Sequence, residues 1–137
     1  MEIRNQEIKD ELDELIVDGG QGINTSLLAE LLKGNLTLSK DGNINYEGLF
    51  YKLSERKRML LYLLARKVIV DKKLKEIREK ADYKEIAEGA FISLKNIARI
   101  HLRDLRSVVP KDNEGYFILN YNLIKCKEIL IKNGSRN

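Results

Sequence analysis

The sequence predicts a mainly α-helical fold with small β-hairpins, made of a small helical N-terminal segment (residues 1–53) and a domain (residues 54–137). Apolar residues recur at helical spacing through most of the chain. Two pairs of short β-prone runs flank polar turns that contain glycine, which is typical of hairpins. The charge also divides the chain: residues 1–53 carry five Lys or Arg against ten Asp or Glu, and residues 54–137 carry 20 against 11.

The N-terminal segment contains two predicted helices followed by a hairpin. The first helix spans residues 6–17, because its aliphatic residues recur every three or four positions and a glycine pair follows. The second begins with Asn24 or Thr25 as its N-cap, continues through two leucine pairs and ends at Gly34. Apolar and polar residues then alternate on both sides of a turn at residues 40–42, which indicates two short strands.

A strong helix is predicted to open the second part of the chain. Ser54 is its N-cap, and the leucine-rich run that follows places Leu60, Leu61, Leu64 and Val68 on the inward face. Residues 71–80 are predicted to form a highly charged helical connector. Its only apolar anchors are Leu74 and Ile77.

Residues 85–106 are predicted to form two short helices around a turn. In the second helix, cations recur every three or four residues and therefore share one face. The other face is apolar and suited to packing on a core. The cations are Lys95, Arg99, Arg103 and Arg106, and the apolar residues are Leu94, Ile97, Ala98, Leu102 and Leu105. A helix of this kind suits insertion into a polyanionic groove.

This pattern resembles the helix-turn-helix of DNA-binding proteins. Ala87 stands where such motifs favour a small residue, Ile92 where they favour an aliphatic residue after the turn, and Ile97 where they favour a buried aliphatic. Ser93 falls at the helix-capping position, where its hydroxyl could accept from the free N–H groups of the next helix. One position departs, because Phe91 replaces the usual glycine of the turn. We therefore expect a turn of non-standard shape.

The residues after this motif extend the resemblance to the winged helix fold. Val108-Val109 and residues 116–119 are β-prone runs around a polar turn that ends in glycine, and a last helix is predicted from Tyr121 to Lys132. The resemblance covers residues 54–132, and the layout is similar to that of small archaeal regulators. It implies a DNA-binding protein, most simply a transcriptional regulator.

The resemblance also implies which residues contact DNA, because the second helix of such a motif lies in the major groove. Arginine can form two hydrogen bonds with guanine and asparagine two with adenine, while lysine meets guanine or phosphate. The helix N-terminus would bind a phosphate, and the flanks would contact the backbone. The hairpin tip carries Asp112 and Glu114, so we expect a short wing held away from the DNA. The predicted DNA-binding residues are Ser93, Lys95, Asn96, Arg99, Arg103, Arg106 and Lys111.

The sequence offers no recognisable catalytic or metal-binding set. His101 is the only histidine and Cys126 the only cysteine, and each is more typical of a packed helix position than of a ligand or nucleophile. We therefore expect no enzyme activity, no cofactor and no metal. The longest apolar stretch has seven residues (59–65) and no signal peptide is recognisable, so we expect a cytoplasmic protein without a membrane partner. Abundant Lys, Glu and Ile favour a thermophile.

The sequence also allows partners other than DNA. The acidic segment 1–53 and the acidic hairpin tip favour a second interpretation, a winged helix that binds a protein within a nucleic-acid assembly. RNA is a third partner, disfavoured because no aromatic series interleaves the cations. The leucine pairs at 27–28 and 31–32 present more apolar surface than a short extension can bury alone, which predicts a homodimer. Its interface would be residues 1–53 or the terminal helix.

Overall fold

The computed structural model describes residues 24–132. The helix predicted over residues 6–17 and the tail after Lys132 lie outside the described residues. The helices are α2 (Thr25–Leu32), α3 (Glu55–Asp71), α4 (Tyr83–Gly89), α5 (Lys95–Asp104) and α6 (Leu123–Ile131), with short 3-10 turns at Phe50–Lys52 and Asn120–Asn122. Strands β1 (Leu36–Leu38) and β2 (Ile44–Tyr46) form one antiparallel pair, and β3 (Lys111–Asp112) and β4 (Gly115–Tyr116) form another. The described chain is therefore mainly helical with small hairpins, as predicted.

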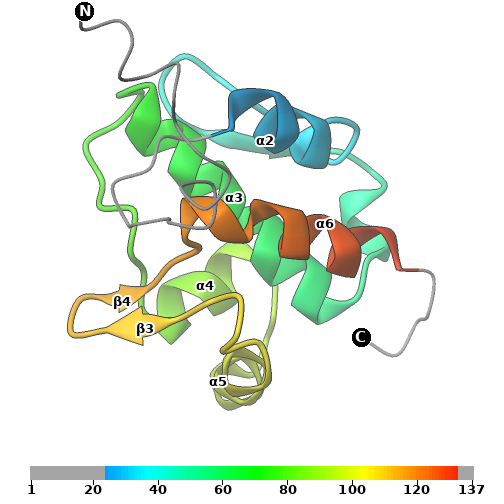
Figure 1. Cartoon of the computed structure of the whole chain (residues 1–137), viewed down its shortest axis with the longest axis vertical. Coiled ribbons are helices and arrows are strands. Elements are labelled where there is room, and N and C mark those ends of the chain that lie inside the picture. The colour runs from blue at the N-terminus through cyan, green and yellow to red at the C-terminus, as the bar shows by residue number, and fades with distance from the viewer. Residues whose placement is uncertain (1–23, 133–137) are drawn as a thin grey trace, which may run out of the picture.

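Helix α3 is the centre of the fold, and α2, α4, α5 and α6 all pack on it (Figure 1). Ser54 is its N-cap, as predicted, and its side chain accepts a hydrogen bond from the Lys57 amide. Leu60, Leu61 and Leu64 have no exposed surface. The helix is buried on nearly all sides because it carries apolar residues around its whole circumference. No helix within residues 24–132 is long and apolar enough to cross a membrane.

Residues 24–53 share one hydrophobic core with the rest of the described chain. The predicted N-cap of α2 is confirmed, because the Asn24 side chain accepts from the Leu27 amide at 3.1 Å. The first hairpin is also confirmed, with Leu36 opposite Tyr46 and Leu38 opposite Ile44. All four leucines of α2 are buried within the single chain. Helices α3 and α6 of the same chain cover these leucines, so their burial requires no second chain and gives no argument for a homodimer.

The predicted helical connector over residues 71–80 is wrong, because α3 ends at Asp71 and residues 72–80 are irregular. The physical reason is Arg66, a side chain only 6% exposed. Its guanidinium donates hydrogen bonds to the backbone carbonyls of residues 78–80, with Nε 3.1 Å from the Glu79 oxygen. In a helix these carbonyls would point along the helix axis toward later amides. Here they point toward the buried Arg66 guanidinium instead, so the segment is not helical.

The two helices of the predicted motif are present as α4 and α5. Asp82 caps α4, because its carboxylate accepts from the Glu85 amide at 2.8 Å and the Glu85 side chain accepts from the Asp82 amide at 3.0 Å. This reciprocal pair is a capping box. Gly89 ends the helix where no side chain would fit, since a Cβ there would lie 2.1 Å from the Tyr62 ring.

Phe91 occupies the turn between α4 and α5 with a φ of +60°, in the left-handed region where glycine is usual. Aromatic contacts hold it there, with ring centroids 5.2 Å from Tyr46 and 5.5 Å from Tyr51. The Arg58 guanidinium donates to the carbonyl of Ala90 at 2.8 Å. These contacts offset the strain of a bulky residue in this conformation, and they attach the turn to β2, to the 3-10 turn at Phe50–Lys52 and to α3.

The second hairpin is present, but its strands differ from the prediction. Val108 and Val109 were expected to form the first strand, yet they lie before β3, where both side chains are buried. Tyr116 also pairs with Ala81, and the amide of each donates to the carbonyl of the other at 2.7 and 3.0 Å. Gly115 allows this approach, because a Cβ there would lie 2.7 Å from the Ala81 oxygen. The β3–β4 hairpin is thereby fixed beside the start of α4.

The terminal helix α6 lies within the predicted range and has two distinct faces. Its inner face buries Leu123 and Cys126, and burial raises the pKa of the Cys126 thiol to about 12. This cysteine is a packed residue, as predicted. The outer face leaves Ile124 and Ile131 59% and 65% exposed, and Tyr121 in the preceding 3-10 turn is 46% exposed.

Candidate nucleic-acid interface

Helix α5 lies at the edge of the molecule (Figure 1). Ala98, Leu102 and Leu105 are buried, as predicted. Leu94 is 65% exposed and Ile97 is half-buried, so their assignment to the buried face is wrong. The helix begins at Lys95, one residue after the predicted start at Leu94, and Ala98 is its first buried residue.

Ser93 does not cap α5, which corrects a second expectation. The N-cap residue is Leu94, and no side chain accepts from the free amides there. The Leu94 carbonyl accepts instead from the Ala98 and Ile97 amides. Ser93 is exposed one position before the cap, and its contact with a phosphate stays a prediction. It lines a shallow depression at the helix N-terminus together with Lys95.

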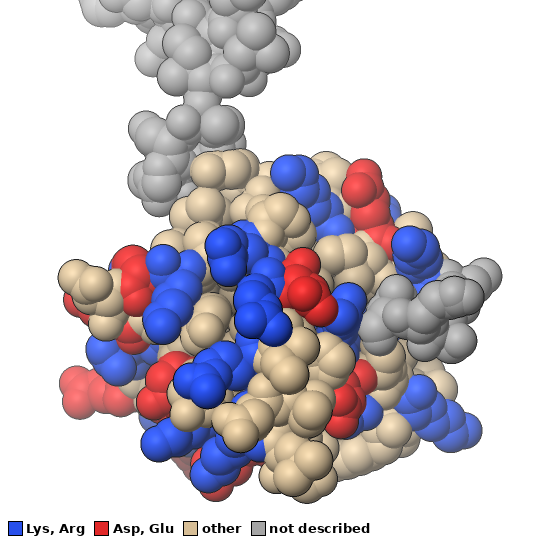
Figure 2. Space-filling view, turned by 90° about the horizontal axis from the view of Figure 1, so that it is seen from below, with Lys and Arg blue, Asp and Glu red and all other residues tan. Residues whose placement is uncertain are grey.

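Exposed cations run along one side of α5 (Figure 2). A groove, here named the α5 groove, separates this side from the β3–β4 hairpin. It is lined by Asn96, Arg99, Ile100, Leu102, Arg103, Arg106, Val109, Pro110, Lys111 and Tyr116. Five of the seven predicted DNA-binding residues are among them, while Ser93 and Lys95 lie at the N-terminal end of the helix. The groove therefore carries four cations and no acidic side chain.

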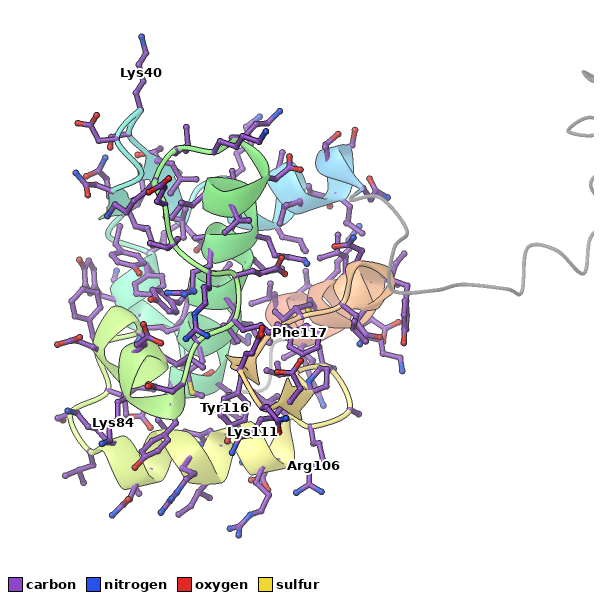
Figure 3. The ribbon with its side chains drawn as sticks, turned by 90° about the vertical axis from the view of Figure 1, so that its left-hand side faces the viewer. Lys40, Lys84, Arg106, Lys111, Tyr116 and Phe117 are labelled. Carbon is purple, nitrogen blue, oxygen red and sulfur yellow. The ribbon has the colours of Figure 1, made fainter. Side chains whose placement is uncertain are left out.

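Tyr83 and Lys84 of α4 extend this surface, and sequence reasoning missed both. The Arg99 guanidinium lies 4.8 Å from the centre of the Tyr83 ring, a cation–π contact that orients it. Lys84 is exposed near one end of α5, whereas Arg106, Lys111 and Tyr116 gather near the other (Figure 3). Lys84 carried no signal in the sequence because Glu85 and Glu88 accompany it on the same short helix.

The acidic residues of the β3–β4 hairpin have an internal partner. Lys80 Nζ lies 2.5 Å from a carboxylate oxygen of Asp112 and 3.5 Å from one of Glu114. The hydrogen bond from Lys80 lowers the pKa of Asp112, and the same bond raises the pKa of Lys80. Part of the negative charge that was expected to repel DNA is therefore balanced within the protein. Lys80 escaped sequence reasoning because it lay in the supposed helical connector.

The opposite side of α5 is tied to the start of α3. His101 Nδ1 accepts from Arg56 Nε at 3.0 Å, and His101 Nε2 lies 2.9 Å from a carboxylate oxygen of Glu55. The Arg56 guanidinium also pairs with Asp104 at 2.5 Å. These bonds fix the rotation of α5 and half-bury its histidine, as the sequence predicted for a packed imidazole.

The described residues contain no group of three or more His, Cys, Asp or Glu side chains that could hold a metal ion. Comparisons of the chain with protein-family models, with curated proteins and with solved structures each found no match.

Proposed function

We propose that this protein is a winged helix-turn-helix DNA-binding protein, most simply a transcriptional regulator, that inserts α5 into the major groove. The order of its elements supports the fold assignment. Helix α3 is followed by the bridging residue Ala81, then by α4 and α5, and then by the β3–β4 hairpin. Ala81 pairs with Tyr116 as a minimal third strand, and residues of the hairpin and of α5 line one groove, which supports assigning the hairpin as a wing.

The α5 groove is the observation that carries the proposal. Four cations from the helix, its C-terminal flank and the hairpin line one surface without an intervening acid. An α-helix with its side chains is about 10–12 Å across, and the major groove of B-DNA is about 12 Å wide, so the exposed helix α5 has the diameter to lie in it. In this arrangement Asn96 and Arg103 meet base edges, while Lys84, Arg99, Arg106 and Lys111 meet phosphates on either side.

Salt dependence tests this proposal directly. The purified protein would be titrated with an unrelated duplex at increasing salt, and binding would be followed by fluorescence anisotropy. Four to six neutralised phosphates predict a log–log slope of about −4 to −5, because each contact contributes about −0.9. Absence of binding at low salt, or a slope near zero, would refute DNA binding through this surface.

A second candidate function is protein binding, and one observation favours it. Leu49, Tyr51, Phe91 and Leu94 are each more than half exposed, and they come from the turn between α4 and α5 and from the segment before α3. Tyr51 and Phe91 are in contact, with ring centroids 5.5 Å apart. A partner bound on such apolar residues would show little salt dependence. Absence of duplex binding at low salt in the same titration would therefore favour protein binding.

We also propose a homodimer, formed through the outer face of α6. Burial of the α2 leucines removes the argument for residues 24–53, whereas Ile124 and Ile131 remain 59% and 65% exposed on α6. A two-fold pair of modules would contact two half-sites. Ile124→Asp is expected to convert the dimer to a folded monomer in sedimentation equilibrium. A monomeric wild-type protein, or a variant that stays dimeric, would refute this interface.

A further inference from the structure

Ile100 is an apolar side chain in the middle of the cationic face of α5. It is 43% exposed, and it lines the α5 groove with Asn96 four residues before it and Arg103 three residues after it. Residues at these separations are neighbours on a helix surface. An isoleucine in this place interrupts a polar surface with a group that can neither donate nor accept a hydrogen bond.

The orientation of Ile100 follows from the residues around it. Ala98 and Leu102 are buried, and each is two positions from Ile100. Because successive helical residues turn by about 100°, Ile100 lies about 200° from both and points away from the core.

The two adjacent residues in the sequence are held to the sides of the helix. The Arg99 guanidinium lies 4.8 Å from the Tyr83 ring centre, and His101 Nε2 lies 2.9 Å from Glu55. Ile100 therefore stands on the crest of α5, between a flank tied to α4 and a flank tied to α3.

The major groove offers one apolar group on the base edges that such a crest could meet, the C5-methyl group of thymine. We infer that Ile100 selects a thymine through this methyl group, in the DNA site contacted by Asn96 and Arg103. The inference rests on the proposed DNA binding of α5 and adds a specificity-determining residue to it. Hydrogen-bonding side chains beside Ile100 would recognise neighbouring base pairs, adenine by Asn96 and guanine by Arg103.

The helix rise sets the spacing of these contacts. Four residues separate Asn96 from Ile100, which is about 6 Å along the helix, and three separate Ile100 from Arg103, about 4.5 Å. Bases of one strand are about 3.4 Å apart along the DNA axis. The thymine is therefore expected within about two base pairs of both the adenine and the guanine.

Replacement of thymine by deoxyuridine tests the inference, because it removes the methyl group and retains the pairing. A preferred duplex would first be selected from a randomised pool with the wild-type protein. Each thymine in that duplex would then be replaced singly, and the dissociation constant measured at fixed salt. We expect a three- to tenfold loss of affinity at one thymine, the scale of burying roughly one or two methyl-sized groups.

Two variants complete the experiment. Ile100→Ala is expected to bind the thymine and deoxyuridine duplexes equally and to keep the salt dependence of the wild type. Val70→Ala is the control, a change of a partly exposed β-branched residue near the C-terminal end of α3, outside both the α5 groove and α6, and it should keep the discrimination. Both changes are at helix positions with exposed surface where alanine is well tolerated, so both proteins should fold.

The outcomes are separable. Discrimination that is lost only in Ile100→Ala supports the role of this side chain. Equal binding of all the substituted duplexes by the wild-type protein, or discrimination that survives in Ile100→Ala, overturns it while leaving DNA binding in place. Failure of the wild-type protein to bind any duplex would overturn the proposed function, and this inference with it.

Discussion

Helices α3 and α5 both carry many cations, but they use them differently. In α3, Arg56 and Lys67 pair with acids, while Lys57, Arg58 and Arg66 donate to backbone carbonyls. The cations of α5 and its C-terminal flank form no ion pair with an acid within the described residues; they are Lys95, Arg99, Arg103 and Arg106. The difference lies in position rather than in composition. Cations of the central helix stabilise the fold, and those of the edge helix remain available for a polyanion.

Among the tests of this difference between α3 and α5, removal of two cations of α5 is expected to have the largest effect, and that effect is on duplex affinity. Arg99→Ala combined with Arg103→Ala should weaken duplex binding by about 2–4 kcal/mol, because Arg103 is assigned to a base edge and Arg99, oriented by the Tyr83 ring, adds a cation to the same surface. The melting temperature should stay within a few degrees of the wild type, as is usual for exposed positions. Fluorescence anisotropy and thermal melting measure the two quantities.

The matched control removes two charges at a distance from α5. Lys40 lies on the side of the molecule opposite α5 (Figure 3), and Lys125 is exposed on α6. The pair Lys40→Ala and Lys125→Ala changes the net charge equally and should reduce affinity only slightly. An equal loss in both double variants would mean that net charge, and not the α5 surface, determines binding.

A cation of α3 should show the opposite behaviour. Arg66→Met keeps the aliphatic stem but removes every donor to the carbonyls of residues 78–80, and should lower the free energy of unfolding by about 3 kcal/mol. Urea denaturation measures this change. Arg78→Met is the control, an exposed arginine whose loss should change stability by less than about 0.5 kcal/mol. A fully stable Arg66→Met protein would show that the guanidinium does not hold the connector.

The same contrast explains how much of the fold could be predicted from the sequence. Patterns within a few residues predicted the structure correctly where neighbouring residues alone determine it, as at the N-caps Asn24 and Ser54 and in the first hairpin. The prediction of a helical connector over residues 71–80 was wrong because the conformation of this segment depends on Arg66. That residue lies in another element, so no local pattern reveals its effect. The second hairpin was misplaced because Val108 and Val109 are β-prone but are buried as part of the core before the strand begins.

The candidate site shows the same limit. The periodicity of the α5 sequence correctly predicted that its cations are exposed, because the spacing of residues around one helix depends only on that helix. It misplaced Leu94 and Ile97, because the rotation of α5 is set by Arg56, Glu55 and the start of α3. Ile97→Asp would accordingly cost less stability than the same change at Leu102, which is 1% exposed.

The smallest effect concerns Lys80, a cation that belongs to neither helix and balances the hairpin acids. Lys80→Gln would leave Asp112 and Glu114 uncompensated beside the α5 groove, and should weaken duplex binding by a few-fold at low salt. Adding Asp112→Asn to this variant should restore most of the lost affinity, because it removes the larger of the two repulsions.

The dependence of stability on pH at acid values gives an independent test of the Lys80–Asp112 ion pair. The pKa of Asp112 is lowered in the folded state, so its contribution to stability is present above the unfolded pKa of a carboxyl group and is lost as the pH falls through the lowered value. Urea denaturation of the wild type between pH 7 and pH 2 should therefore show a slightly steeper loss of stability than Lys80→Gln. Identical pH profiles, together with unchanged DNA binding, would mean that the pair neither stabilises the hairpin nor shields the groove.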